Sequence, residues 1–209
     1  MGALAAMVLG LVCAGCMGPG PVERTLVVLG GCPGQQSGAP GQPSHMAQAA
    51  LPIVAVLPFE ASAALDRRAV AIQEGNVLRS ATTWSWEDTP RRMVTQAVLD
   101  QLACSGAWGV LWPYRPRGEH FAVLGGRVDD FSVALHPQGG EVRVALTVDV
   151  WSAQKGPLLG RLSVQATAPC SDATPQAAAV AAQDALRDAM RQVEQGLQTL
   201  RPRMEMTGE

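Results

Sequence analysis

The clearest pattern in the chain is an alternation of apolar and polar residues in its second half. Every second residue from Val142 to Val150 is apolar, and most residues between them are polar or charged. The same alternation occurs over 131–135 and 162–166. Because successive side chains of a strand point to opposite faces of a sheet, these segments predict strands with one buried and one solvated face. Turn residues containing glycine and proline separate them, which predicts a three-stranded antiparallel meander.

The first half of the chain predicts shorter strands. Residues 53–57 are continuously apolar, which is typical of a central strand covered on both faces, and Pro58 ends the run. Further β-rich runs lie at 25–29, 69–73 and 77–82. The turn residues Gly75-Asn76 separate the last two.

Two segments show the spacing of amphipathic helices. In the first, Asp88 is the expected N-cap, Pro90 lies near the first turn, and the helix ends near 104–106. The second opens at Thr174-Pro175, is rich in alanine and stops at Pro202. Together the elements predict an α+β fold, in which a largely antiparallel sheet carries both helices on one face as a two-layer sandwich.

The first residues predict a lipoprotein signal peptide. The run from Ala3 to Gly15 has no charge and is shorter than the roughly 20 residues of a membrane-spanning helix. Ala14-Gly15-Cys16 places two small residues before a cysteine, as lipoprotein signal peptidase requires. We therefore expect lipidation of Cys16; the alternative is an ordinary cleaved signal with a chance cysteine. Met17, rather than an aspartate, favours the outer membrane.

The expected boundaries follow from these elements. Residues 1–16 form the signal peptide, and residues 17–24, rich in glycine and proline, form a flexible tether. A single α+β domain spans 25–200, and 201–209 form a disordered tail.

Composition narrows the class of protein. Of the 209 residues, 47% are hydrophobic and 16% charged, so the chain can bury a core. The net charge of −2 gives no reason to expect nucleic acid as a partner. With Cys16 acylated, Cys32, Cys104 and Cys170 remain in a compartment that permits disulfides. They allow one bridge plus one free thiol, and the pairing is not readable from the sequence.

The sequence shows no catalytic or metal-binding motif. His45 and His136 fall in expected loops, and His120 has no serine motif to pair with. Asp129 and Asp130 are neighbours on an expected strand, so their side chains point to opposite faces. We therefore expect no enzyme activity, no metal site and no cofactor.

Two segments carry candidate partner-binding residues. Asp66, Arg67 and Arg68 place two guanidinium groups beside a carboxylate; the alternative is a surface ion pair. Trp84 and Trp86 precede the first helix, where packing beneath the helix start is the alternative. Tryptophan and arginine are frequent interface anchors, so these five residues form the candidate surface.

The order of these segments resembles the ABC-type transport auxiliary lipoprotein family, whose members accompany Mce-type lipid transport systems. The resemblance extends over nearly all of the expected domain. It is carried by Ile53–Leu57, Leu65–Arg68, Ala69–Gln73, Asn76–Leu78, Trp84 or Trp86, Pro90–Leu102, Val128–Phe131, Asp149–Trp151 and the final alanine-rich helix.

The resemblance implies a lipid-anchored periplasmic protein without catalytic activity. It implies contact with the Mce-domain substrate-binding protein of an ABC transporter, and self-association into homo-oligomers. An outer-membrane assembly or cell-wall-associated lipoprotein with a different protein partner is the alternative function. A periplasmic enzyme would need a site that the sequence does not show.

Overall fold

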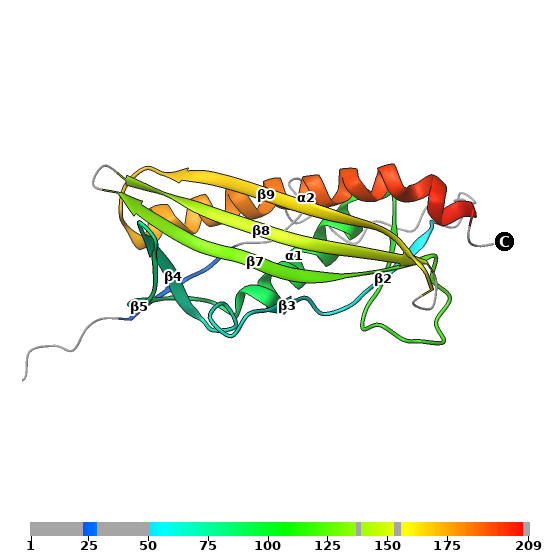
Figure 1. Cartoon of the computed structure of the whole chain (residues 1–209), viewed down its shortest axis with the longest axis horizontal. Helices are drawn as coiled ribbons and strands as arrows, with labels where there is room; N and C mark the ends of the chain where they lie inside the picture. Colours follow the sequence, from blue (N-terminus) through cyan, green and yellow to red (C-terminus); the bar gives the residue numbers. More distant parts are fainter. Residues whose placement is uncertain (1–22, 29–50, 137–138, 153–155, 207–209) are drawn as a thin grey trace, which may run out of the picture.

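The computed structural model describes residues 23–28, 51–136, 139–152 and 156–206. Within these residues the chain forms one nine-stranded sheet and two helices (Figure 1). The strands are β1 (Arg24–Leu26), β2 (Ile53–Val56), β3 (Glu60–Ala61), β4 (Ala69–Glu74), β5 (Val77–Trp86), β6 (Gly109–Leu111), β7 (Ala122–His136), β8 (Gly139–Ser152) and β9 (Leu158–Cys170). The helices are α1 (Pro90–Ser105) and α2 (Pro175–Met206). The α+β class is confirmed.

The long strands β7, β8 and β9 form the antiparallel meander that the alternation predicts. The apolar residues of β8 from Val142 to Val150 are at most 1% exposed, while the residues between them stay partly exposed. A β-bulge interrupts the pairing of β7 with β8 between Val128 and Asp130. The meander therefore has one fully buried face and one half-solvated face.

The other edge of β7 pairs with three short parallel strands in succession. Strand β2 aligns Val54 with Ala122, β3 aligns Glu60 with Arg127, and β4 pairs with the second half of β7. The sheet is therefore mixed, and the expectation of a largely antiparallel sheet holds only for part of it. The reason is that the alternation of side chains fixes which face is buried but not the direction of the neighbouring strand.

Both helices contribute to the core. Figure 1 shows α1 and α2 behind the long strands, and α2 packs along β8 and β9 and also contacts α1. The buried side of α2 is lined largely by alanine, including Ala178, Ala182, Ala185 and Ala189, each at most 1% exposed. Such small side chains allow the helix axis to approach the sheet closely.

Two predicted helix ends are wrong. The N-cap of α1 is Thr89 rather than Asp88, because the Asp88 carboxylate instead accepts a hydrogen bond from the Thr89 backbone N–H at 2.7 Å. Helix α2 contains Pro202 and continues to Met206, so the expected disordered tail is helical over 201–206. Met204 is completely buried, and this packing holds the last turn although Pro202 cannot donate a backbone hydrogen bond.

The sequence-based predictions for Cys16 and Cys32 lie outside the described residues. Of the two cysteines that are described, Cys104 is disulfide-bonded and Cys170 is a buried free thiol. Burial raises the pKa of the Cys170 thiol. None of the helices in the described ranges is both long enough and apolar enough to cross a membrane.

Candidate functional site

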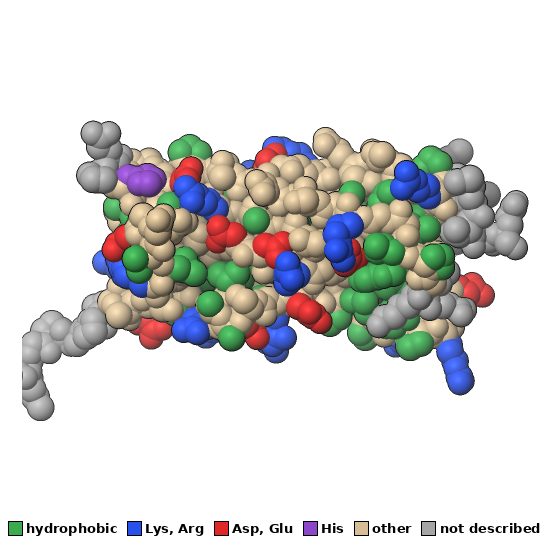
Figure 2. Space-filling view, viewed as in Figure 1, with side chains coloured by type: hydrophobic (Ala, Val, Ile, Leu, Met, Phe, Trp, Pro, Cys, Tyr) green, Lys and Arg blue, Asp and Glu red, His purple; other side chains and the backbone are tan. Residues whose placement is uncertain are grey.

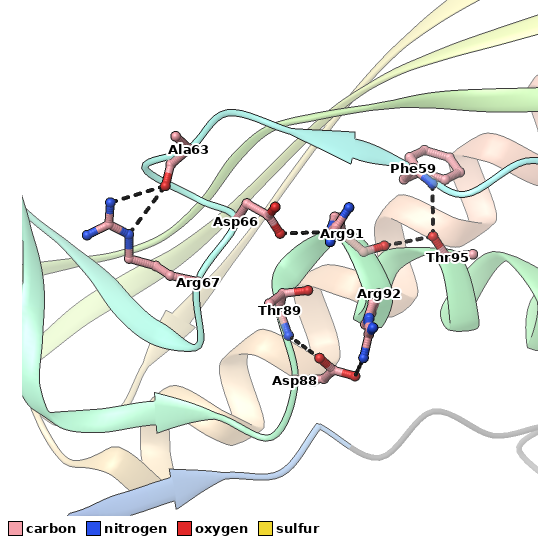
Figure 3. Close-up of polar contacts among 9 residues, drawn as sticks. All are labelled: Phe59, Ala63, Asp66, Arg67, Asp88, Thr89, Arg91, Arg92 and Thr95. Atoms are coloured by element: carbon pink, nitrogen blue, oxygen red, sulfur yellow. Dashed lines mark hydrogen bonds and ion pairs between the residues drawn. The ribbon is translucent and has the colours of Figure 1, made fainter.

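The candidate residues Asp66, Arg67 and Arg68 lie on the connection between β3 and β4, beside the start of α1 (Figure 3). Asp66 forms an ion pair with Arg91 of α1, with 2.7 Å between Oδ1 and Nε. Its backbone N–H donates to the Ser62 carbonyl at 2.8 Å, which turns the chain at this point. Asp66 therefore ties the connection to the helix.

The two arginines beside it hold backbone rather than acidic side chains. Arg67 Nη2 donates to the Ala63 carbonyl at 3.1 Å, and Arg68 Nε donates to the Trp86 carbonyl at 3.1 Å. Both residues remain exposed, so part of each guanidinium still faces solvent. The first role of the motif is thus to brace a connection, and its outer surface remains open to a partner.

The structure separates the two candidate tryptophans. Both lie in the last three residues of strand β5. Trp86 is fully buried and meets the Phe131 ring edge-to-face, with 5.1 Å between ring centroids. Trp84 is partly buried against the same core. The interface role expected for Trp86 is therefore corrected: its indole packs inside the protein and has no surface to offer.

A groove lies next to the motif, beside Arg91 of α1. We call it the α1 groove; its volume is ≈ 790 Å³. It is lined by Pro58, Phe59, Glu87, Asp88, Arg91, Arg92, Met93, Thr95, Gln96, Leu99 and Trp112. Buried Phe59, Met93 and Leu99 form an apolar floor, and exposed Pro58 and Gln96 lie on its rim.

Hydrogen bonds fix the shape of the groove. The Phe59 N–H donates to Thr95 Oγ1 at 3.0 Å, and that hydroxyl donates to the Arg91 carbonyl at 2.7 Å (Figure 3). Strand β2 ends just before this contact, so the connection between β2 and β3 is held against α1. The groove is therefore a preformed feature of the fold.

Charges around the groove are balanced and weakly held. Arg92 lies 3.5 Å from Asp88, and its side chain is 69% exposed. Exposed ion pairs contribute at most about 1 kcal/mol, so these groups can re-pair with a partner at low cost. This arrangement suits a protein contact.

One groove residue was missed by the sequence interpretation. Trp112 follows β6 and is 44% exposed, more than either tryptophan that the sequence singled out. The surrounding sequence, Trp-Pro-Tyr-Arg-Pro-Arg, has no hydrophobic periodicity. That lack of periodicity was the available signal that the indole belongs to a surface loop.

Residues considered for chemistry have structural neighbours. His120 stacks edge-to-face with Tyr114, with 5.7 Å between ring centroids. Asp129 accepts hydrogen bonds from Arg127 and Thr147. Within the described ranges, no cluster of three or more histidine, cysteine or acidic side chains is arranged to hold a metal ion.

Comparison with known proteins identifies the class. The profile of the ABC-type transport auxiliary lipoprotein component family matches residues 35–194, and the chain belongs to this family. The resemblance drawn from the order of the motifs is thereby confirmed. The family is one of lipoproteins that act as auxiliary components of transport.

Solved structures support the fold. A crystal structure of a Xanthomonas campestris protein matches with a TM-score of 0.66 and 15% identity, covering 89% of this chain and 100% of that chain. The crystal structure of an uncharacterized protein matches with a TM-score of 0.60 and 13% identity, covering 81% of this chain and 95% of that one. At these identities the likeness shows the fold alone. No curated protein is significantly similar to the chain in sequence.

Proposed function

We propose that this protein is a non-catalytic auxiliary component of an ABC/Mce-type lipid transport system. Acyl chains on Cys16 hold it on the periplasmic side of the outer membrane, and the folded domain docks the Mce-domain substrate-binding protein. The observation that carries the proposal is the family match over 35–194. The Ala14-Gly15-Cys16 sequence supports the anchor.

The α1 groove is the proposed docking surface. It combines an apolar floor with a rim of weakly paired charges, as interface cores and rims do. The braces from Asp66 and Thr95 keep it open before any partner binds, so little conformational entropy is lost on docking. Arg67 and Arg68 extend the surface on the β3–β4 side, and Trp84, partly buried against the core, remains a candidate contact. Self-association into a homo-oligomer is part of the proposal.

The test is co-purification from the native host. A tagged chain is extracted in mild detergent, and co-purifying proteins are identified by mass spectrometry. Recovery of an Mce-domain protein supports the proposal. Recovery of only outer-membrane assembly or cell-wall proteins would favour the alternative function.

Matched variants locate the contact. Arg92→Glu reverses a charge in the groove next to Asp88, and Arg187→Glu makes the same change next to Asp184 on α2. We expect loss of the partner only with Arg92→Glu, at unchanged thermal stability. Equal recovery with both variants would remove the groove from the proposal. Cys16→Ala tests the anchor separately, because membrane attachment retained in that variant would contradict it.

A further inference from the structure

One end of the sheet gathers segments that are far apart in the chain. Strands β2, β6, β7 and β9 begin there and β8 ends there, as the pairing of Ile53 with Gly109 and of Leu158 with Trp151 shows. The C-terminus of α2 reaches the same end, where Arg203 donates to the Leu159 carbonyl at 3.3 Å. The loop between β6 and β7 extends from it, at the lower right of Figure 1. We call this region the aromatic-basic end.

Exposed apolar side chains concentrate at the aromatic-basic end. Eight large apolar residues within the described ranges are exposed, and four of them lie here. They are Leu51 (40%), Ile53 (38%), Trp112 (44%) and Leu158 (50%). Figure 2 shows hydrophobic side chains gathered toward the right of the visible face, where this end lies.

Exposed cations also gather at this end. Of the other described arginines, eight form ion pairs with aspartate or glutamate, while Arg67 and Arg68 donate to backbone carbonyls. Arg115 and Arg117 are exposed in the loop and form no ion pair with any residue in the described ranges. Arg201 and Arg203 add positive charge from α2, whereas Glu119 is the loop's acidic residue.

We infer that the aromatic-basic end is a second, non-covalent contact with a bilayer surface containing anionic phospholipid. Indole rings partition to the boundary between headgroups and acyl chains, because one end is apolar and the other donates a hydrogen bond. The arginines around the apolar side chains can then bind lipid phosphates, because the phosphates are distributed across the membrane surface as the arginines are across this end of the protein. A protein partner would instead need an apolar patch for the exposed aliphatic side chains and, around that patch, a separate acidic group for each arginine.

The position of the end agrees with membrane contact. In Figure 1 the start of β1 and the β6–β7 loop both lie along the lower side of the molecule. The chain that leads back to Cys16 joins at the start of β1, so a lipid anchor on Cys16 and the β6–β7 loop can contact the same bilayer. This inference rests on the proposed lipid anchor and adds a statement about the orientation of the domain. The domain contacts the membrane surface with its long side and is not attached through the tether alone.

The test uses the full-length lipidated protein reconstituted into vesicles of equal parts phosphatidylcholine and phosphatidylglycerol. Some of the lipid carries bromine on its acyl chains, which quenches tryptophan fluorescence on contact. We expect quenching that Trp112→Phe abolishes and that Trp84→Phe, a change in β5 away from this end, preserves. The double variant Arg115→Gln/Arg117→Gln should reduce the quenching at least about twofold, while Arg187→Gln/Arg191→Gln should not. In vesicles of phosphatidylcholine alone, quenching should be weak.

Flotation of the same vesicles separates this inference from the proposed anchor. Loss of wild-type flotation would contradict the anchor, whereas flotation with unchanged quenching in Trp112→Phe would overturn only the inference. Trp112 also lines the α1 groove, so a photo-crosslinking residue at position 112 in living cells distinguishes the two surfaces. Adducts with lipid would support the inference, whereas adducts with a protein and none with lipid would assign Trp112 to the docking groove and overturn it.

Discussion

Replacing Trp86 with alanine tests whether this residue acts in the core or at an interface. The Trp86 side chain is fully buried, and a buried tryptophan removes about 200 Å² from water. At about 25 cal/mol per Å² this corresponds to about 5 kcal/mol, of which alanine retains about 1 kcal/mol. The edge-to-face contact with Phe131 adds about 1 kcal/mol.

One contribution to the free energy of unfolding opposes this loss. The Trp86 indole N–H is buried without a hydrogen-bond partner among the described atoms, and its removal recovers about 1–2 kcal/mol. The expected net loss is therefore about 3–4 kcal/mol, within the range for burial of a large aromatic side chain. A domain with 5–15 kcal/mol of total stability would be severely weakened.

The assay is urea unfolding of wild type, Trp86→Ala and Trp112→Ala, followed by circular dichroism. Trp112 is 44% exposed, so its alanine variant should lose less than about 1 kcal/mol and serves as the control. A loss below about 1 kcal/mol in Trp86→Ala, together with loss of a partner, would refute the core assignment.

Three further predictions follow from particular contacts. Gly126→Ala should cost about 1–3 kcal/mol in urea unfolding, because a Cβ there would lie 2.3 Å from a backbone carbonyl oxygen; Gly125→Ala, which meets side chains at 3.2 Å, should cost less. Burial raises the pKa of the Asp130 carboxyl, so the folded state holds that proton more tightly and stability falls as pH rises through the folded pKa. Asp130→Asn should therefore raise the melting temperature near about pH 7 and lose this advantage near about pH 3; an equal shift at both would contradict the assignment. Peptide mapping after alkylation should label Cys170 slowly until denaturant is added, and Cys104 only after reduction; rapid native labelling of either would contradict its assignment.

The sequence predicted best the elements whose periodicity is long enough to see. The alternation from Val142 to Val150 predicted both a strand and its buried face, since burial of one face repeats every second residue. The parallel pairing of β2 and β4 with β7 was missed, because each strand is short and nothing within it specifies a distant partner. Pro202 predicts a helix end, but tertiary packing of Met204 outweighs the lost hydrogen bond.

The candidate site was harder to predict. The sequence identified Asp66 as part of a charged motif, but its partner Arg91 lies in a separate element that only the fold brings near. Trp86 and Trp112 differ in exposure because other elements of the fold pack over Trp86 but leave Trp112 partly open to solvent. The residues next to a tryptophan in the sequence do not reveal which distant elements will pack over it. Residue types thus indicated a surface, and tertiary contacts decided which side chains belong to it.

The pairing of three early strands with one late strand has a consequence for biosynthesis. A chain is made from its N-terminus, so β2, β3 and β4 emerge before β7, the strand whose edge they share. Until then the apolar Val54–Val56 segment has no β7 partner and is open to aggregation. The β7–β8–β9 meander has neighbours close in sequence and forms quickly once synthesised. The first half of this domain therefore cannot complete its sheet until the last strands are present, on whichever side of the membrane the chain folds.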